Sequence, residues 1–283
     1  MATNKVTIAD LLSLSSTLEA LSDTSRLDVE VLLCHVLGKP RSYLFTWPEQ
    51  TIAPELYQSF QTLLKRRHSG EPVAHILGRQ EFWSLELQVN ASTLIPRPET
   101  ELLVETALEL MQTKEARVLD LGTGTGAIAL ALASERSNWQ ILAVDVVPQA
   151  LELAESNRKN LGFDNVSLMQ SNWFDAIPLQ GFDLIVANPP YIDTHDIHLT
   201  QGDVRFEPAS ALVAERNGLA DIETIVRGAA VYLSTGGYLL IEHGFDQGAA
   251  VRSLLEEAGY AEVRTQADLN GRQRLSLARR QKD

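Results

Sequence analysis

The run Asn188-Pro189-Pro190-Tyr191 directly follows the apolar segment 182–187 and combines residue types that can do chemistry. The Asn188 side-chain oxygen and the Pro189 carbonyl can each accept one N–H of a planar amide or amine, and the two prolines hold the loop rigid because each fixes its own φ. Tyr191 adds an aromatic face that attracts a nearby cation. We therefore expect Asn188, Pro189, Pro190 and Tyr191 to orient a planar nitrogen that acts as a nucleophile. The alternative is a plain turn, since Asn-Pro often opens turns.

A glycine-rich loop supplies the second candidate site. Gly122-Thr123-Gly124-Thr125-Gly126 follows the apolar run 117–121 and leads into the small-residue segment 127–135, which is the strand, loop and helix order of nucleotide-binding folds. Asp145 comes about twenty residues later, where a carboxylate can accept hydrogen bonds from both ribose hydroxyls. The G-x-G-x-G spacing differs from the NAD fingerprint, and no Walker Gly-Lys-Ser/Thr follows. Together with the amide-orienting loop 188–191, this glycine spacing favours S-adenosylmethionine as cofactor. The alternative is that the glycine loop is only a tight structural turn.

Other polar and aromatic residues are weaker candidates. Trp173, in the segment 171–175 after the third expected strand, could cover an adenine ring or belong to the core. Asp120 could hold loop amides, bind the cofactor's ammonium group, or only stabilise the turn. His195 and His198 suggest a metal, but a solvated loop is the better interpretation. Glu242-His243 points to the same sheet edge, where a carboxylate can simply cap a helix, and it is not part of the predicted site.

The elements that must position these residues begin at residue 116. From there, short apolar runs alternate with helical stretches, as expected for βαβ units and a mainly parallel sheet. We expect seven strands, at 117–121, 140–144, 166–170, 182–187, 237–242, 261–265 and 274–278. Helices are expected at 127–135, 148–160, 219–233 and 247–258. A short loop joins the last two strands, so they should pair antiparallel at one edge. The predicted fold is an α/β, doubly wound, seven-stranded methyltransferase (Rossmann-like) sheet with an antiparallel edge hairpin, and residues 193–218 form a long connection beside the site.

The region before this sheet has helical periodicity up to about residue 70. We expect a helical N-terminal domain at 1–78, a β-hairpin linker at 79–97 with a turn around Asn90-Ala91-Ser92, and a catalytic domain at 98–283. The basic run 65–68 suits a helix C-terminus as solvated charge, with a contact to a partner as the alternative.

Composition restricts the function further. The formal net charge is −13, of which residues 1–95 contribute −2, with 8 Lys/Arg against 10 Asp/Glu. Such acidity argues against a nucleic acid as substrate, because the negative charge would repel its phosphate backbone. The single cysteine excludes a multi-cysteine zinc site, and neither a signal sequence nor an apolar span is visible. We expect a cytoplasmic monomer without a metal, a membrane contact or direct nucleic-acid binding.

The chain resembles the release factor glutamine methyltransferases, also called PrmC or HemK. Over essentially the whole length, the signatures are Ile95-Pro96-Arg97-Pro98-Glu99-Thr100-Glu101, the run 118–131, Asn188-Pro189-Pro190-Tyr191-Ile192 and Val204-Arg205-Phe206-Glu207-Pro208. The resemblance implies methylation by S-adenosylmethionine of the glutamine in the Gly-Gly-Gln motif of class 1 peptide chain release factors, which the helical domain helps to dock. It also implies that Gly122 to Gly126, Asp145, Trp173 and Asn188 contact the cofactor, and that Asn188 to Tyr191 hold the glutamine.

Three alternatives stay open from the residues themselves. A ribosomal-protein glutamine methyltransferase would share the loop and differ mainly in the N-terminal domain. A DNA adenine N6-methyltransferase would use the same loop chemistry, but the acidic charge and the lack of a basic, aromatic surface oppose it. A non-catalytic release-factor or ribosome binding module would retain only the pocket, whereas Asn188 and Asp145 are intact here.

Overall fold

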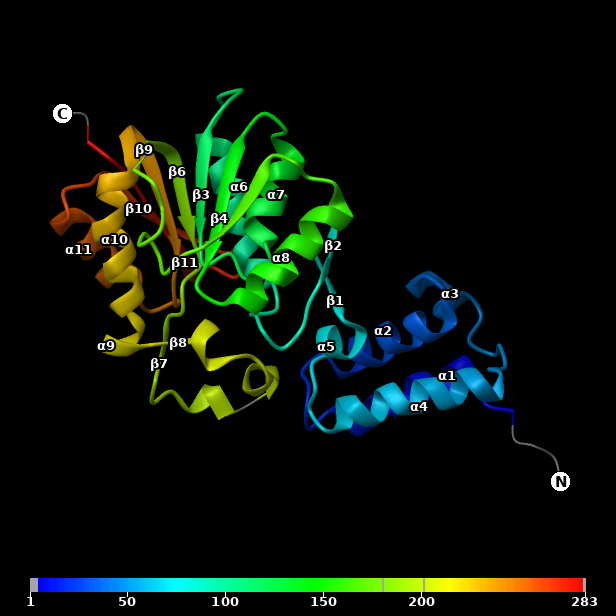
Figure 1. Cartoon of the computed structure of the whole chain (residues 1–283). Coiled ribbons are helices and arrows are strands. Elements are labelled where there is room, and N and C mark those ends of the chain that lie inside the picture. Colours follow the sequence, from blue (N-terminus) through cyan, green and yellow to red (C-terminus); the bar gives the residue numbers. More distant parts are fainter. Residues whose placement is uncertain (1–4, 180, 201, 282–283) are drawn as a thin grey trace. The chain divides into compact units, whose positions relative to one another are not determined.

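The computed structural model describes residues 5–179, 181–200 and 202–281, and it divides the chain into two compact units (Figure 1). One unit comprises Met1–Arg79 with Ile197–Phe206, and the other comprises Gln80–Asp196 with Glu207–Asp283. The segment Ile197–Phe206, which the expected boundaries assigned to the catalytic part, therefore packs with the N-terminal unit.

The first unit is helical, as the periodicity predicted. Its helices are α1 (Ile8–Ser13), α2 (Ser25–Leu37), α3 (Arg41–Thr46), α4 (Pro54–His68) and α5 (Val73–Leu77), with the 3₁₀ segment η1 (Leu14–Leu18). Local signals set their ends: Thr7 and Asp10 form a capping box before α1, and Gly38 ends α2 in the left-handed conformation. Leu32, Leu33 and Phe60 are fully buried in a core shared by α2 and α4.

An ion triad centred on the buried Arg67 attaches the segment Ile197–Phe206 to this unit. Arg67, at the end of α4, is 2% exposed. Its guanidinium donates to Asp28 Oδ2 and to Asp203 Oδ1, each at 2.8 Å. Asp203 lies in the 3₁₀ segment η4 (Gly202–Phe206), after η3 (Ile197–Thr200). The expectation that the run 65–68 is solvated charge is therefore wrong for Arg67, because long-range carboxylates that the local sequence does not reveal draw it into the interior.

The second unit is built on a seven-stranded sheet in the order β10-β11-β9-β6-β3-β4-β5 (Figure 1). The strands are β3 (Arg117–Leu121), β4 (Gln140–Asp145), β5 (Val166–Gln170), β6 (Phe182–Ala187), β9 (Leu233–Glu242), β10 (Ala261–Ala267) and β11 (Gln273–Arg279). Neighbours from β9 to β5 are parallel, and β11 pairs antiparallel with both β9 and β10. The predicted sheet and its edge hairpin are confirmed.

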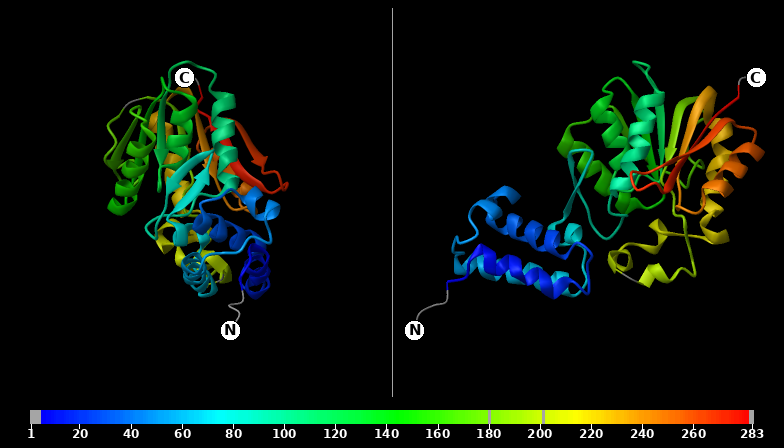
Figure 2. Two further views of the ribbon diagram at one scale, coloured as in Figure 1. Left: turned by 90° about the vertical axis from the view of Figure 1, so that its right-hand side faces the viewer. Right: turned by 180° about the vertical axis from the view of Figure 1, so that it is seen from behind.

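Helices cover both faces of the sheet because successive strand residues point to opposite sides. Val118 belongs to the apolar core under α6 (Glu101–Leu110) and α7 (Ala127–Glu135), whereas Leu119 belongs to the core under α10 (Ala220–Tyr232) and α11 (Gly248–Glu257). Figures 1 and 2 show the two helical layers, with α8 (Pro148–Leu161) beside β4 and β5.

A two-stranded sheet, β1 (Arg79–Phe82) with β2 (Leu85–Gln88), precedes the seven-stranded one. Its turn is Trp83-Ser84, with φ of 52° and 60°, not Asn90-Ala91-Ser92 as expected. Two positive φ angles usually call for Asn-Gly, so this turn has no recognisable sequence signal.

The connection after β6 is not wholly irregular. It contains β7 (Ile192–Asp193), which pairs with β8 (Val213–Ala214), the 3₁₀ segment η5 (Ala209–Ala211) and the short helix α9 (Glu215–Gly218). The remaining 3₁₀ segment, η2 (Pro98–Thr100), leads into α6. Among the described residues, no helix has the length and apolarity needed to cross a membrane.

Candidate functional site

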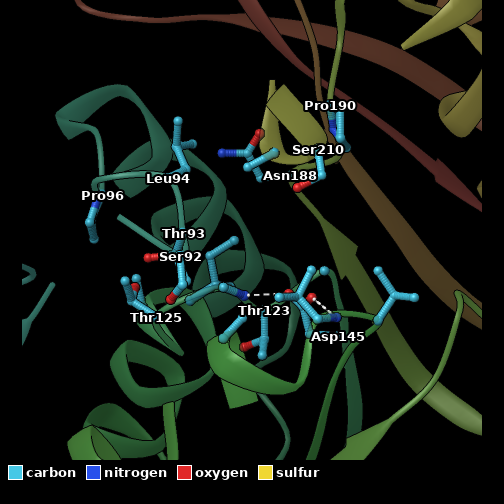
Figure 3. Close-up of a pocket in the computed structure, with 18 of the residues that line it drawn as sticks. Ser92, Thr93, Leu94, Pro96, Thr123, Thr125, Asp145, Asn188, Pro190 and Ser210 are labelled. Atoms are coloured by element: carbon cyan, nitrogen blue, oxygen red, sulfur yellow. Dashed lines mark hydrogen bonds between the residues drawn. The ribbon is translucent and has the colours of Figure 1, made fainter. Parts of the chain in front are cut away.

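One pocket of the second unit lies where the parallel strands end. The carboxyl ends of β3, β4, β5 and β6 deliver the glycine loop, Asp145, the segment after Gln170 and the Asn188 loop to this edge. Figure 3 shows Thr123, Asp145 and Asn188 around the same space. The predicted residues that line it are Gly122, Thr123, Gly124, Thr125, Asp145, Trp173, Asn188 and Pro190. Gly126, Pro189 and Tyr191, which were also predicted, are not among the lining residues.

The glycine loop depends on backbone conformations that favour glycine. Gly122, Gly124 and Gly126 have φ of 72°, 55° and 84°. A Cβ on Gly122 would meet the Trp173 ring at 3.4 Å, and one on Gly126 would meet Leu130 Cδ1 at 3.0 Å. The loop can therefore present backbone N–H groups close to a ligand only because side chains are absent.

Asp145 is oriented by the backbone around it. Its Oδ2 accepts from the Gly124 amide and its Oδ1 accepts from the Val147 amide, both at 2.9 Å. Each carboxylate oxygen can accept a further hydrogen bond, because an ionised carboxylate offers about four lone-pair sites. Asp145 thus combines a fixed orientation with free acceptor capacity at the pocket.

The Trp173 ring lies against Gly122 at the pocket, and Trp173 has a φ of 47°. Asp221, in the first turn of α10, also lines the pocket. Burial raises the pKa of Asp221, and its side-chain hydrogen bond with Trp173 opposes that rise. Asp221 carries no motif, so the sequence offered no signal for it.

The side-chain amide of Asn188 has a hydrogen-bond partner at its nitrogen but none among the described residues at its oxygen. Its Nδ2 donates to Thr100 Oγ1 at 3.2 Å. Its Oδ1 is buried and has no hydrogen-bond partner within the described part of the chain. A buried amide oxygen without a donor is costly unless a ligand supplies one, so this atom marks a place for an incoming N–H.

Tyr191 is held at both its ends. Its hydroxyl lies 3.5 Å from Glu242 Oε1, a long contact, and its backbone carbonyl accepts from Gln247 Nε2 at 2.9 Å. Burial raises the pKa of Tyr191, so the phenol stays neutral. Sequence reasoning left Glu242 outside the site and did not name Thr100 or Gln247 as site residues, although all three reach this loop.

Glu242 ends β9 beneath the loop and is 3% exposed. Burial raises the pKa of its carboxyl to about 7, while a side-chain hydrogen bond with Thr100 and the positive charge of Arg274 oppose the rise. Its neighbour His243 faces inward, 2.9 Å from Ser276 Oγ.

An ion pair joins two of the signature segments. Arg97, which lines the pocket, donates to Glu207 Oε1 at 2.7 Å, and that carboxylate is fully buried. Ser210 and Ala211, just after Glu207, also line the pocket. The pair thus anchors the segment that closes one side of the pocket.

The remaining candidates lie elsewhere. Asp120 is fully buried and does not line the pocket, and its Oδ2 accepts from the Thr123 hydroxyl at 2.6 Å. This placement favours a role in holding the loop over contact with a ligand's ammonium group. The exposed His195 contacts Asp193, and the side chain of His198 is outside the described residues. The described residues contain no group of three or more His, Cys, Asp and Glu that could hold a metal ion.

Comparison with known proteins adds family information. Residues 11–78 match the family model described as "PrmC N-terminal domain", and residues 112–273 match a "Methyltransferase domain". A release factor glutamine methyltransferase from Shewanella oneidensis is 54% identical over 262 residues, covering 93% of this chain and 92% of that protein. One from Pseudomonas aeruginosa is 55% identical over 256 residues, covering 90% and 93%.

Solved structures agree on the fold. A methyltransferase from Pyrococcus furiosus superimposes with a TM-score of 0.55 at 16% identity, covering 78% of this chain and 99% of that one. At such low identity the likeness extends to the fold alone. The high identity to full-length relatives, together with the two domain matches, is decisive: the chain belongs to the family of release factor glutamine methyltransferases.

Proposed function

We propose that this chain transfers a methyl group from S-adenosylmethionine to the side-chain amide nitrogen of the glutamine in the Gly-Gly-Gln motif of class 1 peptide chain release factors. The observation that carries the proposal is the buried Oδ1 of Asn188 at the pocket, which finds no hydrogen-bond partner among the residues that the structure describes. Family membership supports the choice of glutamine, because the relatives are named for that substrate.

The cofactor would be held by the glycine loop, Asp145 and Trp173. Gly122 to Gly126 would offer backbone N–H groups, and Asp145 has lone pairs left for ribose hydroxyls. The Trp173 ring, fixed against Gly122, would cover the adenine. When bound, S-adenosylmethionine supplies an electrophilic methyl group on a sulfonium.

The acceptor amide needs help because its nitrogen lone pair is delocalised into the carbonyl. Asn188 Oδ1 and the Pro189 carbonyl would each accept one N–H of the glutamine, which favours a lone pair localised on nitrogen and supports the positive charge that grows there. Neither group has to move, because Thr100 holds Asn188 and the prolines fix the backbone. The Tyr191 ring would stack on the planar amide and attract the approaching positive charge.

The helical unit and the net charge of the chain would help to select the substrate. We assign docking of the release factor to the helical unit, and we expect a cytoplasmic monomer that does not bind nucleic acid directly. The net charge of −13 supports a protein substrate over duplex DNA. A ribosomal protein is the second candidate, because the loop chemistry is the same.

A labelling experiment tests the proposal. The purified chain is incubated with methyl-labelled S-adenosylmethionine and, in separate tubes, a class 1 release factor, its Gly-Gly-Gln variant with alanine for glutamine, a ribosomal protein and duplex DNA. We expect label on the intact release factor alone. Label on DNA but on no protein, or equal label on the alanine variant, would refute it.

A further inference from the structure

We infer that Gln247 is a positioning residue, which fixes the far end of the acceptor loop, residues 188–191, by donating from its amide nitrogen to two backbone carbonyls. This inference rests on the proposed function, in which the acceptor loop holds the glutamine amide of the substrate. Gln247 does not line the pocket, so it would act through the loop and not by touching the substrate.

The side-chain amide of Gln247 makes three hydrogen bonds to backbone groups. Its Nε2 donates to the Tyr191 carbonyl at 2.9 Å and to the Asn217 carbonyl at 3.0 Å. Its Oε1 accepts from the Gly244 amide at 2.8 Å. The orientation of the amide is therefore unambiguous, because a backbone carbonyl can only accept and a backbone N–H can only donate. Exchanging the nitrogen and the oxygen would lose all three hydrogen bonds.

The acceptor loop has few groups by which other elements can hold it. Pro189 and Pro190 lack an N–H, so neither can donate a hydrogen bond. The near end of the loop directly follows β6, and Asn188 is held there through its Nδ2. At the far end, Tyr191 is the first residue after the prolines, and its carbonyl accepts from Gln247. A change at Gln247 therefore acts on one end of the loop and leaves the other end in place.

The second carbonyl that Gln247 holds belongs to a strained turn. Arg216 and Asn217 have φ of 57° and 55°, and Gly218 follows with 78°. Left-handed backbone is costly for a residue with a side chain and persists where tertiary contacts hold it. The hydrogen bond from Gln247 to the Asn217 carbonyl is such a contact. One nitrogen thus joins this turn to the acceptor loop.

Gly218 makes room for the junction. A Cβ at Gly218 would lie 2.0 Å from the Tyr191 carbonyl oxygen and 2.7 Å from Gln247 Nε2. Both distances are too short for non-bonded atoms, so an alanine at this position has to displace the Tyr191 carbonyl or the Gln247 amide. Gly218 therefore offers a second, independent way to break the same hydrogen bond.

The oxygen end of Gln247 is fixed by the turn that precedes α11. The Gln247 amide donates to the Gly244 carbonyl at 3.0 Å, and the Gly244 amide donates to Gln247 Oε1, so the two residues bind each other reciprocally. The fully buried His243 supports this turn, because its ring nitrogens lie 2.8 Å from the Gly244 carbonyl and 2.9 Å from Ser276 Oγ. The turn therefore orients the Gln247 side chain toward Tyr191.

Gln247→Glu tests the nitrogen end alone. The new side chain keeps its size and an oxygen for the Gly244 amide, but at pH 8 it is ionised, since the ordinary pKa of glutamate is about 4.3, and it offers the two carbonyls no donor. We expect kcat on the release factor to fall about tenfold, the effect of losing one well-placed hydrogen bond. Cofactor affinity and KM for the release factor should stay within about threefold of wild type, because the cofactor would be held by other loops.

A matched control separates this effect from the loss of any glutamine. Gln112 Nε2 also donates to two backbone carbonyls, those of Leu108 and Glu109, each at 3.0 Å, but Gln112 is exposed just after α6 and does not line the pocket. Gln247→Ala should lower kcat as Gln247→Glu does, whereas Gln112→Ala should leave kcat unchanged. Each kcat is expressed per cofactor-binding site counted by calorimetry, so that unfolded protein does not count as lost turnover.

A double variant tests whether the Tyr191 carbonyl is the point of action. Gly218→Ala should lower kcat and retain cofactor affinity. In the Gly218→Ala background, Gln247→Glu should lower kcat by less than about threefold more, because both changes break the same hydrogen bond. If Gly218→Ala does not fold, the two single variants of Gln247 and the Gln112 control still decide the inference.

The results that overturn the inference are distinct from failure of the proposed function. A kcat within about threefold of wild type in either Gln247 variant, or a kcat loss in Gln112→Ala as large as theirs, would overturn it. Losses that multiply in the double variant, or a loss of cofactor affinity as large as the loss of kcat, would do the same. A wild-type chain that methylates another acceptor contradicts the proposed function alone, and the same ratios are then measured on that acceptor.

Discussion

The amide oxygen of Asn188 is buried and has no donor among the described residues, and this distinguishes Asn188 from an asparagine that only ends a strand. Replacing it with alanine should lower turnover by about 10²–10³, the usual cost of losing one preorganised polar group at a reacting centre. Cofactor affinity should stay within a few fold. Single-turnover kinetics and calorimetry measure the two quantities, and unchanged turnover would refute the assigned role.

Asp120 provides a prediction about pH and stability. Burial raises the pKa of its carboxyl to about 7, well above the value of an unfolded chain. Its contribution to stability is therefore complete below about pH 4 and is lost as the pH rises toward 7, since only the unfolded state then ionises freely. Relative to the wild type, Asp120→Asn should gain up to about 4 kcal/mol in unfolding free energy from pH 4 to pH 8. Urea titrations at several pH values measure this, and a difference that does not vary with pH would contradict it.

Site residues could be predicted from the sequence where one local segment carries the chemistry. The glycine loop, Asp145 and Asn188 each follow a recognisable strand, and the structure brings them to one pocket. Thr100, Asp221 and Gln247 could not be found in this way. Their contacts with Asn188, Trp173 and Tyr191 join separate elements, and a lone polar residue on a helix carries no signal of a partner far along the chain.

At the scale of elements, the strands and helices of the seven-stranded unit could be predicted because their apolar residues recur at regular intervals. The hairpin turn was not, since Trp83 and Ser84 adopt positive φ angles without glycine or asparagine. Tertiary contacts compensate: the Trp83 amide donates to Glu101 Oε1 and its indole to Glu135 Oε1, each at 2.9 Å.

The turn yields a stability prediction. Ser84 is exposed with φ of 60°, so Ser84→Gly should stabilise the second unit by about 0.5–1 kcal/mol, the left-handed strain less the added backbone entropy. Ser253→Gly, at an exposed position inside α11, is the control and should destabilise by about 0.5 kcal/mol. Urea unfolding measures both, and a loss at Ser84 would mean that the turn is not strained.

At the scale of the whole molecule, the sequence predicted a helical part and a catalytic part, but not that Ile197–Phe206 packs with the helical one. That arrangement depends on Asp203 reaching Arg67, a contact spanning 136 positions. The signature segment 204–208 is therefore divided between the two units, with Val204 to Phe206 in the helical unit and Glu207 and Pro208 in the other.

Arg67→Met should destabilise the helical unit by about 3–5 kcal/mol, because the Asp28 side chain, 8% exposed, is left as an unpaired buried charge. Asp203→Asn should cost no more than about 1 kcal/mol, because the Asp203 side chain is 37% exposed and water screens the pair. Helical circular dichroism during denaturation follows both variants. Equal losses of unfolding free energy in the two variants would show that the buried Arg67–Asp28 pair is not the main source of the triad's stability.

The central claim is that the acceptor is one glutamine side chain. Mass spectrometry of the release-factor peptide that carries Gly-Gly-Gln, after reaction with cofactor bearing a deuterated methyl group, tests it most directly. The account predicts one labelled methyl group on the side-chain amide of that glutamine. An unmodified glutamine, with label on another residue or on no residue of the release factor, would contradict it.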